Sequence, residues 1–77
     1  MFCLNQIDIG KKCRILSLGV DKNILRRFID IGLIPGVEVE KVLVSPFGGI
    51  SAYAIMGSLI AIRDQDLEGV MVKYENL

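Results

Sequence analysis

The order of apolar and polar residues predicts short β-strands along most of the chain. Residues 36–40 (GVEVE) alternate, so Val37 and Val39 share one face of a strand and Glu38 and Glu40 share the other. Lys41 interrupts this alternation before the apolar residues 42–44, which indicates a bulge or a strong bend. Residues 13–18 (CRILSL) and 70–74 (VMVKY) predict two further strands, one toward each end of the chain.

Two apolar segments on either side of Gly57 and Ser58 predict a β-hairpin. Glycine followed by a small polar residue is typical of a two-residue type II′ turn between strands. Such a turn would place Met56 opposite Leu59 and Tyr53 opposite Ile62. Because side chains alternate across a sheet, one face carries the bulkier set and is the predicted core: Tyr53, Ile55, Ile60 and Ile62. The other face is unusually apolar for a surface and carries Ala54, Met56, Leu59 and Ala61.

Between the first two predicted strands the pattern changes to that of a helix. Asp21 or Asn23 can cap its start, and the apolar positions Leu25, Phe28 and Ile29 recur with Gly32 at helical spacing. Gly32 also suits the left-handed residue that ends a helix, and Pro35 prevents the helix from continuing. Together these elements predict a mainly β fold: a small, partly open barrel of about five strands with one short α-helix inserted after the first strand.

Composition narrows the class of protein. A chain of 77 residues, of which 52% are apolar, predicts one ordered domain covering residues 1–77. Nine basic residues balance nine acidic ones, so the basic excess typical of nucleic-acid binding is absent and no nucleic-acid partner is expected. Residues 42–62 are uncharged and long enough to cross a membrane, but Pro46, Gly48, Gly49 and Gly57 interrupt them, which favours two strands and a turn. The first ten residues lack the features of a targeting peptide, which favours a cytoplasmic location.

Candidate catalytic and metal-binding residues are few. The chain has no histidine, which excludes Ser-His and Cys-His nucleophiles within it, and we expect no enzyme activity. The spacing of an EF-hand calcium loop recurs at Asp64, Asp66, Glu68, Gly69 and Glu75. Helices are not predicted on both sides of that segment, as an EF-hand requires. Cys3 and Cys13 match no zinc or redox motif and are expected to be reduced thiols, so no cofactor and no selective metal site are expected.

Apolar and basic residues in the predicted loops are the candidates for a partner surface. Leu33 follows the helix and Phe47 lies in the turn SPFGG, and each would either plug one end of the barrel or lie exposed. Met56 and Leu59 lie at the hairpin tip, on the face opposite the predicted core, and exposed apolar patches tend to mark partner sites. The candidate partner-binding residues are Arg26, Arg27, Leu33, Pro35, Phe47, Met56 and Leu59.

Four segments, in the order FIDIGLIPGVEVE, SPFGG, GSLIAIR and VMVKY, resemble the FeoA family from about residue 4 to residue 73. The most specific matches are Ile31, Gly32, Leu33, Pro35 and Gly36 after the helix, Pro46, Phe47 and Gly48 in the turn, and Gly57, Ala61 and Arg63 in the hairpin. The resemblance implies an SH3-like barrel and an accessory role in bacterial ferrous-iron transport. It further implies binding to the cytosolic GTP-binding region of the membrane transporter FeoB, which could hold the protein at the inner membrane. Any link to a metal ion would run through that partner.

The chain departs from the family's pattern mainly on one face. The family usually carries charged or polar residues at the positions of Ala54, Met56 and Leu59, and an apolar residue at the position of Lys41. The apolar replacements would suit self-association into a homo-oligomer or an adapted partner. An alternative function is that of an SH3-like regulatory module, related to the C-terminal domain of iron-dependent repressors, that acts through a DNA-binding partner. An RNA-binding barrel would require a basic stripe with interleaved aromatic residues, which the sequence lacks.

Overall fold

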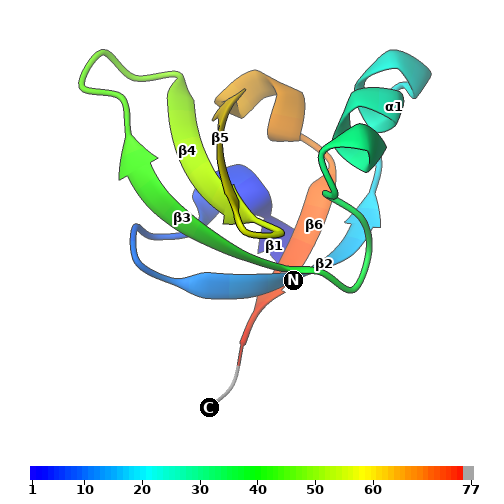
Figure 1. Cartoon of the computed structure of the whole chain (residues 1–77), viewed down its shortest axis with the longest axis horizontal. Coiled ribbons are helices and arrows are strands. Elements are labelled where there is room, and N and C mark those ends of the chain that lie inside the picture. The colour runs from blue at the N-terminus through cyan, green and yellow to red at the C-terminus, as the bar shows by residue number, and fades with distance from the viewer. Residues whose placement is uncertain (76–77) are drawn as a thin grey trace.

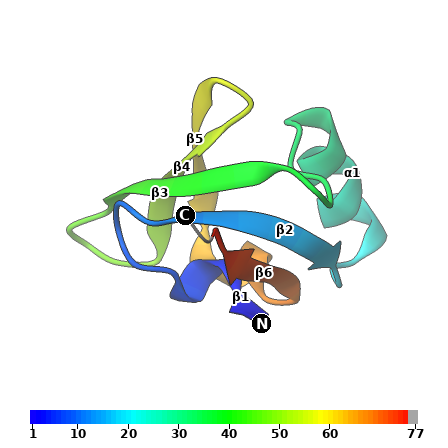
Figure 2. The same cartoon turned by 90° about the horizontal axis from the view of Figure 1, so that it is seen from below.

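The computed structural model describes residues 1–75, whose strands form one antiparallel sheet (Figure 1, Figure 2). The strands are β1 (Phe2–Cys3), β2 (Lys12–Leu18), β3 (Glu38–Val44), β4 (Ile50–Ile55), β5 (Ser58–Arg63) and β6 (Val70–Tyr74). Their order across the sheet is β1-β6-β2-β3-β4-β5, so β1 and β5 are its edges. The sheet curls around a core and its two edges do not pair with each other, which confirms the mainly β, partly open architecture.

The remaining elements are short. The helix α1 (Lys22–Asp30) follows β2, and the 3₁₀ turns η1 (Leu4–Gln6) and η2 (Asp64–Leu67) follow β1 and β5. The helix is therefore placed as predicted with respect to the strand expected at residues 13–18. It follows the second strand and not the first because β1 was not predicted: two residues are too few to show any periodicity.

The two ends of α1 have the predicted chemistry. The carboxylate of Asp21 accepts a hydrogen bond from the N–H of Ile24 at 3.0 Å and caps the start of the helix. Gly32 has φ +86° just beyond the helix end, a backbone conformation that other residues adopt only with strain. Pro35 follows in the loop that leads to β3, so the segment after α1 is specified for a sharp turn.

The buried face of α1 differs from the prediction by one position. Phe28 is 2% exposed and belongs to the core, and Ile24 and Ile31 pack against that core. Ile29, which the sequence assigned to this face, is 52% exposed, so that assignment was wrong. Spacings of four and three residues put Ile24, Phe28 and Ile31 on one stripe, and the stripe is centred one residue earlier than the sequence suggested.

The predicted bulge lies in β3 next to Lys41. Lys41 pairs with Tyr53, but the next pair is Leu43 with Ala52, so Val42 is the extra residue. Lys41 faces inward and is only 8% exposed. Its ammonium group donates hydrogen bonds to two backbone carbonyl groups, which a buried cation requires.

The β4–β5 hairpin forms as expected, but its turn begins one residue earlier than predicted. Ile55 pairs with Ser58, so the two turn residues are Met56 and Gly57. Their φ angles of +49° and +82° are both positive, as in a type I′ turn. The predicted type II′ turn at Gly57 and Ser58 is therefore wrong, and so is the predicted pairing of Met56 with Leu59.

The faces of this hairpin are nevertheless as predicted. Tyr53 pairs with Ile60 instead of Ile62, a shift of two residues, and a shift of two leaves every side chain on its own face. Ile60 packs against the core as a half-buried residue, and the other members of the predicted core face are buried. The whole buried apolar core comprises Leu4, Ile7, Cys13, Ile15, Phe28, Leu33, Val39, Tyr53, Ile55, Ile62, Leu67, Val70 and Val72.

The uncharged residues 42–62 form the end of β3, all of β4 and most of β5. They do not form a helix. Among residues 1–75, no helix has the length and apolar character needed to span a bilayer.

Candidate interaction surface

The outward side of β3, β4 and β5 carries an apolar surface with a charged residue at two of its margins, Glu40 opposite Ala54 and Arg63 opposite Ile50. Pairing aligns Leu43 with Ala52 and Ala52 with Ala61, and the next row aligns Ala54 with Leu59. Leu43 and Leu59 are 56% and 57% exposed. We call this side the outer face, and it comprises Leu43, Ile50, Ala52, Ala54, Leu59 and Ala61. Exposed apolar surfaces of this kind are typical of protein-binding sites.

Met56 extends the outer face at the tip of the β4–β5 hairpin. It is 70% exposed and is the only non-glycine residue with positive φ in the described part of the chain. Its side chain reaches back over Gly32, at the end of α1. Figure 2 shows this hairpin projecting beyond β3 toward the same side as the end of α1. An exposed apolar side chain in a strained backbone conformation is a recurrent feature of functional sites.

Leu33 is not part of this surface. It is fully buried in the core, and its N–H donates to the carbonyl of Phe28 at 2.9 Å. The hydrogen bond turns the chain inward just after the helix and carries the Leu33 side chain into the barrel. Its inclusion among the partner-binding residues was therefore wrong, and the alternative, that it plugs one end of the barrel, is the correct one.

Phe47 and Pro35 both lie exposed, but they are not adjacent to one another. Phe47 is 96% exposed in the β3–β4 loop, so for this residue the plug alternative is wrong. Its loop and the turn at Met56 are at opposite ends of β4 (Figure 1). Pro35 lies beside Ile34, which is 42% exposed, in the loop between α1 and β3. The predicted apolar candidates therefore form two separate regions.

Arg26 and Arg27 lie exposed on α1. Neither forms an ion pair with another residue of the described chain, residues 1–75. Arg27 of α1 lines a small groove together with Ile31, the residue after the helix, and with residues of β5, whereas Arg26 does not. The two arginines thus differ in what they could contact.

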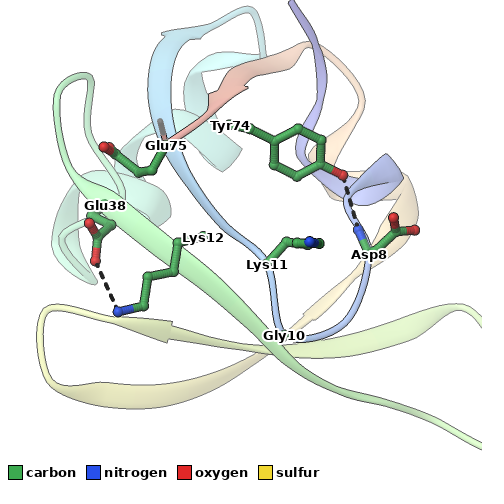
Figure 3. Close-up of a pocket in the computed structure, with 7 residues that line it drawn as sticks. All are labelled: Asp8, Gly10, Lys11, Lys12, Glu38, Tyr74 and Glu75. Atoms are coloured by element: carbon green, nitrogen blue, oxygen red, sulfur yellow. Dashed lines mark hydrogen bonds and ion pairs between the residues drawn. The ribbon is translucent and has the colours of Figure 1, made fainter. Parts of the chain in front are cut away.

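A second, larger groove of about 640 Å³ lies at the start of β2 (Figure 3). Its lining is mixed in charge and consists of Asp8, Gly10, Lys11, Lys12, Glu38, Tyr74 and Glu75. The N–H of Asp8 donates to the Tyr74 hydroxyl at 3.4 Å, and the Glu38 carboxylate lies 3.9 Å from the Lys12 ammonium. Opposite charges on its walls largely neutralise one another, so the groove has no strong preference for an ion of either sign.

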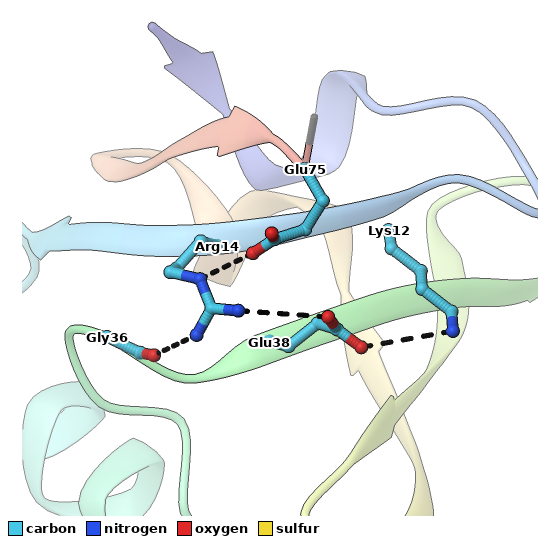
Figure 4. Close-up of polar contacts among 5 residues, drawn as sticks. All are labelled: Lys12, Arg14, Gly36, Glu38 and Glu75. Atoms are coloured by element: carbon cyan, nitrogen blue, oxygen red, sulfur yellow. Dashed lines mark hydrogen bonds and ion pairs between the residues drawn. The ribbon is translucent and has the colours of Figure 1, made fainter. Parts of the chain in front are cut away.

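Arg14 organises the charged side chains beside this groove (Figure 4). Its guanidinium donates to a Glu75 carboxylate oxygen and to the carbonyl of Gly36, the latter at 2.7 Å, and it lies 3.8 Å from Glu38. These contacts connect β2 to the residue after β6, to the loop before β3 and to the start of β3. Such a network of partly exposed pairs is a structural link between strands, and pairs of this kind add little to stability individually.

The residues of the calcium-like spacing lie in η2 and on either side of β6, not in a loop between two helices. Asp66 is 7% exposed and accepts a hydrogen bond from the Arg63 guanidinium at 3.2 Å, while Asp64 lies 3.5 Å from the Ser51 hydroxyl. Across residues 1–75, no three or more His, Cys, Asp or Glu side chains are grouped so that they could hold a metal ion. The carboxylates of η2 therefore bind side chains of β4 and β5.

Two titratable groups of the core have raised pKa values. Burial raises the pKa of the Cys13 thiol to about 11, and the nearby Glu75 and Glu38 carboxylates add to this effect. Burial also raises the pKa of the Tyr53 phenol to about 12, with a contribution from Asp64. Both groups therefore stay protonated and uncharged at neutral pH, and Cys13 lacks the thiolate character of a reactive cysteine.

Sequence reasoning missed the buried position of Lys41. Its ammonium nitrogen lies 3.1 Å from the Ile7 carbonyl and 3.4 Å from the Asn5 carbonyl, both in the segment that follows β1. The only signal in the sequence was the interrupted alternation at this residue, which was interpreted as a bulge. Lys41 holds the N-terminal segment against β3 and leaves the outer face free of its charge.

Solved structures with the same fold include three bacterial proteins. The solution structure of FeoA from Chlorobium tepidum has a TM-score of 0.88 and 23% identity, over 95% of this chain and 70% of that one. Iron(II) transport protein A from Clostridium thermocellum has a TM-score of 0.89 and 26% identity, over 95% of this chain and 45% of that one. FeoA from Stenotrophomonas maltophilia, described in complex with zinc as an SH3 domain protein, has a TM-score of 0.81 and 22% identity, over 95% and 91% of the two chains.

These likenesses confirm the predicted SH3-like fold. No curated protein sequence is significantly similar to this chain. The family model described as the FeoA domain matches residues 2–74, almost the whole length. The chain therefore belongs to the FeoA family.

Proposed function

We propose that this protein is an accessory factor of bacterial ferrous-iron transport and that it acts by binding the cytosolic GTP-binding region of the transporter FeoB. Membership of the FeoA family supports the link to iron transport. The names of two relatives support it further, one as iron(II) transport protein A and one as a candidate activating factor of ferrous-iron transport. In this proposal the protein works in the cytoplasm and reaches the membrane only through its partner.

The observation that carries the proposal is Met56 at the tip of the outer face. A type I′ turn favours asparagine, aspartate or glycine at this position, because its φ of +49° is strained for other residues. One of these three residues would therefore stabilise the turn better than methionine does. A flexible, polarisable thioether that is 70% exposed instead suits an adaptable apolar contact with another protein.

The chemistry of the outer face fits binding better than catalysis. Its central residues are aliphatic, and the two charged side chains on this side of the sheet, Glu40 and Arg63, lie at its margins. Leu43 lies on β3 and Leu59 on β5, and both strands are paired with β4. A partner therefore contacts a preformed surface, and little conformational entropy is lost on binding. We propose that the carboxylates of η2 and the groove at the start of β2 have structural roles and do not contact the partner.

The experiment is a binding assay between this protein and the purified cytosolic GTP-binding region of FeoB. The wild-type protein should bind, and the double variant Met56→Glu with Leu59→Lys should bind at least about tenfold more weakly, because charges carried into an apolar contact lose their hydration without gaining partners. Ile9→Glu is a matched control, since Ile9 is 56% exposed and lies outside the outer face.

Three outcomes separate the possibilities. If the wild-type protein does not bind this region of FeoB, the proposed partner is wrong. If it binds and the double variant binds equally well, the outer face is not the binding site, and the exposed Phe47 loop is the next candidate. Binding to a DNA-binding protein instead of FeoB would favour the regulatory alternative.

A further inference from the structure

One edge of the sheet is open along β5. β5 is the last strand in the sheet order, so only one of its sides is paired. The N–H of Asp64, the residue after β5, donates at 2.8 Å to the carbonyl of Gly49, the residue before β4, so this N–H points toward β4. Backbone direction alternates along a strand, so Ile62 and Ile60 also point toward β4, and Leu59 and Ala61 point toward the open side.

This edge lacks proline and lysine, two of the features that usually protect an edge strand. Its residues, Ser58–Arg63, include no proline and no lysine, and the single charge is at the last position. The strand is six residues long, and the side chains of Leu59 and Ala61 beside its free backbone groups are exposed. Strands of this kind readily pair with an additional strand.

A groove of about 150 Å³ runs along the open edge, with α1 on its far side (Figure 1). It is lined by Ile60, Ala61, Ile62 and Arg63 of β5, by Arg27, Phe28 and Ile31 of α1 or the residue after it, and by Asp66. A groove of this volume holds about one side chain, and α1 closes its other side, so a single extended segment would lie along β5 with one side chain in the groove. A second folded sheet, which would bring further strands behind its edge, would meet the helix.

The charge of the groove indicates the kind of segment it accepts. Arg63 is paired with Asp66 at 3.2 Å, and these two charges balance. Arg27 has no such pair with any residue from 1 to 75, and it leaves the groove with an excess positive charge. The floor of the groove, in contrast, is apolar because of Phe28, Ile31 and Ile60.

We infer that β5 binds an extended segment of a partner protein by strand addition, and that this segment alternates apolar with acidic residues. Its backbone pairs with the free groups of Leu59 and Ala61. Its inward side chains cover the apolar floor at Ile31, and a carboxylate near the helix pairs with Arg27. The added strand also widens the outer face by one strand. The inference does not depend on FeoB being the partner.

The test uses a synthetic peptide of about ten residues in which valine and glutamate alternate, a length sufficient to cover one strand. Nuclear magnetic resonance spectra of the ¹⁵N-labelled protein should show the largest shifts at the amides of Leu59, Ala61 and Arg63. A peptide methylated on alternate backbone nitrogens cannot pair with the strand, and one with lysine for glutamate has the wrong charge. Each of these two control peptides should bind at least roughly tenfold more weakly than the first peptide.

Two variants complete the test. Ala61→Pro removes an N–H that points to the open side, so it leaves the β4–β5 ladder intact and should abolish peptide binding in a folded protein. Arg27→Glu leaves the strand untouched and should reverse the preference, so that the lysine peptide binds better. The inference is overturned if the first peptide at millimolar concentration leaves these three amides unmoved, if backbone methylation does not weaken binding, or if Arg27→Glu leaves the charge preference unchanged.

Discussion

The side chain of Met56 lies directly over the Cα of Gly32, so that a Cβ atom added at Gly32 would come 2.7 Å from the Met56 Cγ. The contact joins the tip of the β4–β5 hairpin to the segment that ends α1. Both residues have positive φ, +49° and +86°. Two turns with positive φ that are distant in the sequence therefore meet, and substitutions at either one should affect the other.

Gly32→Ala should destabilise the protein by about 1–3 kcal/mol, because alanine is strained at this φ and its methyl group meets Met56. The measurement is chemical denaturation of both proteins at the same pH. Combining Gly32→Ala with Met56→Ala should recover only the part of the loss that comes from the collision. If the double variant recovers all of it, the backbone conformation of Gly32 is not strained for alanine.

Met56→Asn should stabilise the fold, by an amount on the order of 1 kcal/mol, because asparagine is well suited to the first position of a type I′ turn. The same variant should weaken binding to the FeoB region, since it removes the exposed thioether. Thermal unfolding and the binding assay together report on both effects. A variant that is less stable than the wild type would indicate that the contact with Gly32 contributes more than the strain removes.

The hairpin shows how much of the fold the sequence could predict. The faces of β4 and β5 follow from alternation alone and were predicted correctly, whereas the turn depends on a single-residue choice of register. The sequence favoured Gly57 and Ser58 because glycine followed by a small polar residue is typical of a type II′ turn. In the structure the side chain of Met56 makes a tertiary contact with Gly32, which local turn preferences do not include.

Lys41 and Leu33 show which features of the candidate site could not be predicted from the sequence. The carbonyl groups that bind the Lys41 ammonium lie 34 and 36 residues earlier in the chain, so no local pattern could pair them. Leu33 looked like a loop residue, and only the hydrogen bond from its N–H to the Phe28 carbonyl shows that the loop turns inward. In contrast, Leu59 was correctly predicted to lie exposed because its face follows from strand alternation, whereas Met56 is exposed as a residue of the turn.

The two sides of the hairpin should respond differently to substitution. Ile55 is fully buried, and Ile55→Ala should lower the free energy of unfolding by roughly 2–5 kcal/mol, which could unfold so small a protein. Met56→Glu with Leu59→Lys changes exposed side chains and should change the same quantity by less than about 1 kcal/mol, the sum of two surface effects. Thermal unfolding by circular dichroism distinguishes the two. Unfolding of the surface variant alongside a benign Ile55→Ala would mean that the faces are reversed.

Tyr53→Phe should leave stability unchanged or raise it slightly. The Tyr53 hydroxyl is buried near the Ser51 side chain but makes no hydrogen bond of good geometry among residues 1–75. Burial of an unpaired hydroxyl is unfavourable, and phenylalanine keeps the packing of the ring while removing that group. The check is the denaturation midpoint of the variant. A loss of more than about 1 kcal/mol would show that the hydroxyl has a partner, such as an ordered water molecule.

Stability should fall as the pH rises above about 9, because the core keeps Cys13 and Tyr53 protonated. The pKa of Cys13 is raised from 9.0 to about 11, so between these values the unfolded chain loses the proton and the folded chain retains it. The unfolded state then binds fewer protons than the native state, and the free energy of unfolding must decrease with pH. At pH 10 the loss from Cys13 should be on the order of 1 kcal/mol relative to pH 8.

Cys13→Ala isolates this contribution, because other groups that titrate at high pH, the lysines included, remain in both proteins. The variant should be less stable at pH 8, since a smaller side chain leaves a gap in the core at a position that is fully buried. Its stability should nevertheless decrease less steeply between pH 8 and pH 11, so that the difference between the two proteins narrows. The residual slope should then include the Tyr53 phenol, whose pKa of about 12 lies above the usual value of 10.0. Parallel curves for the two proteins would mean that the thiol ionises as easily in the folded chain as in the unfolded one.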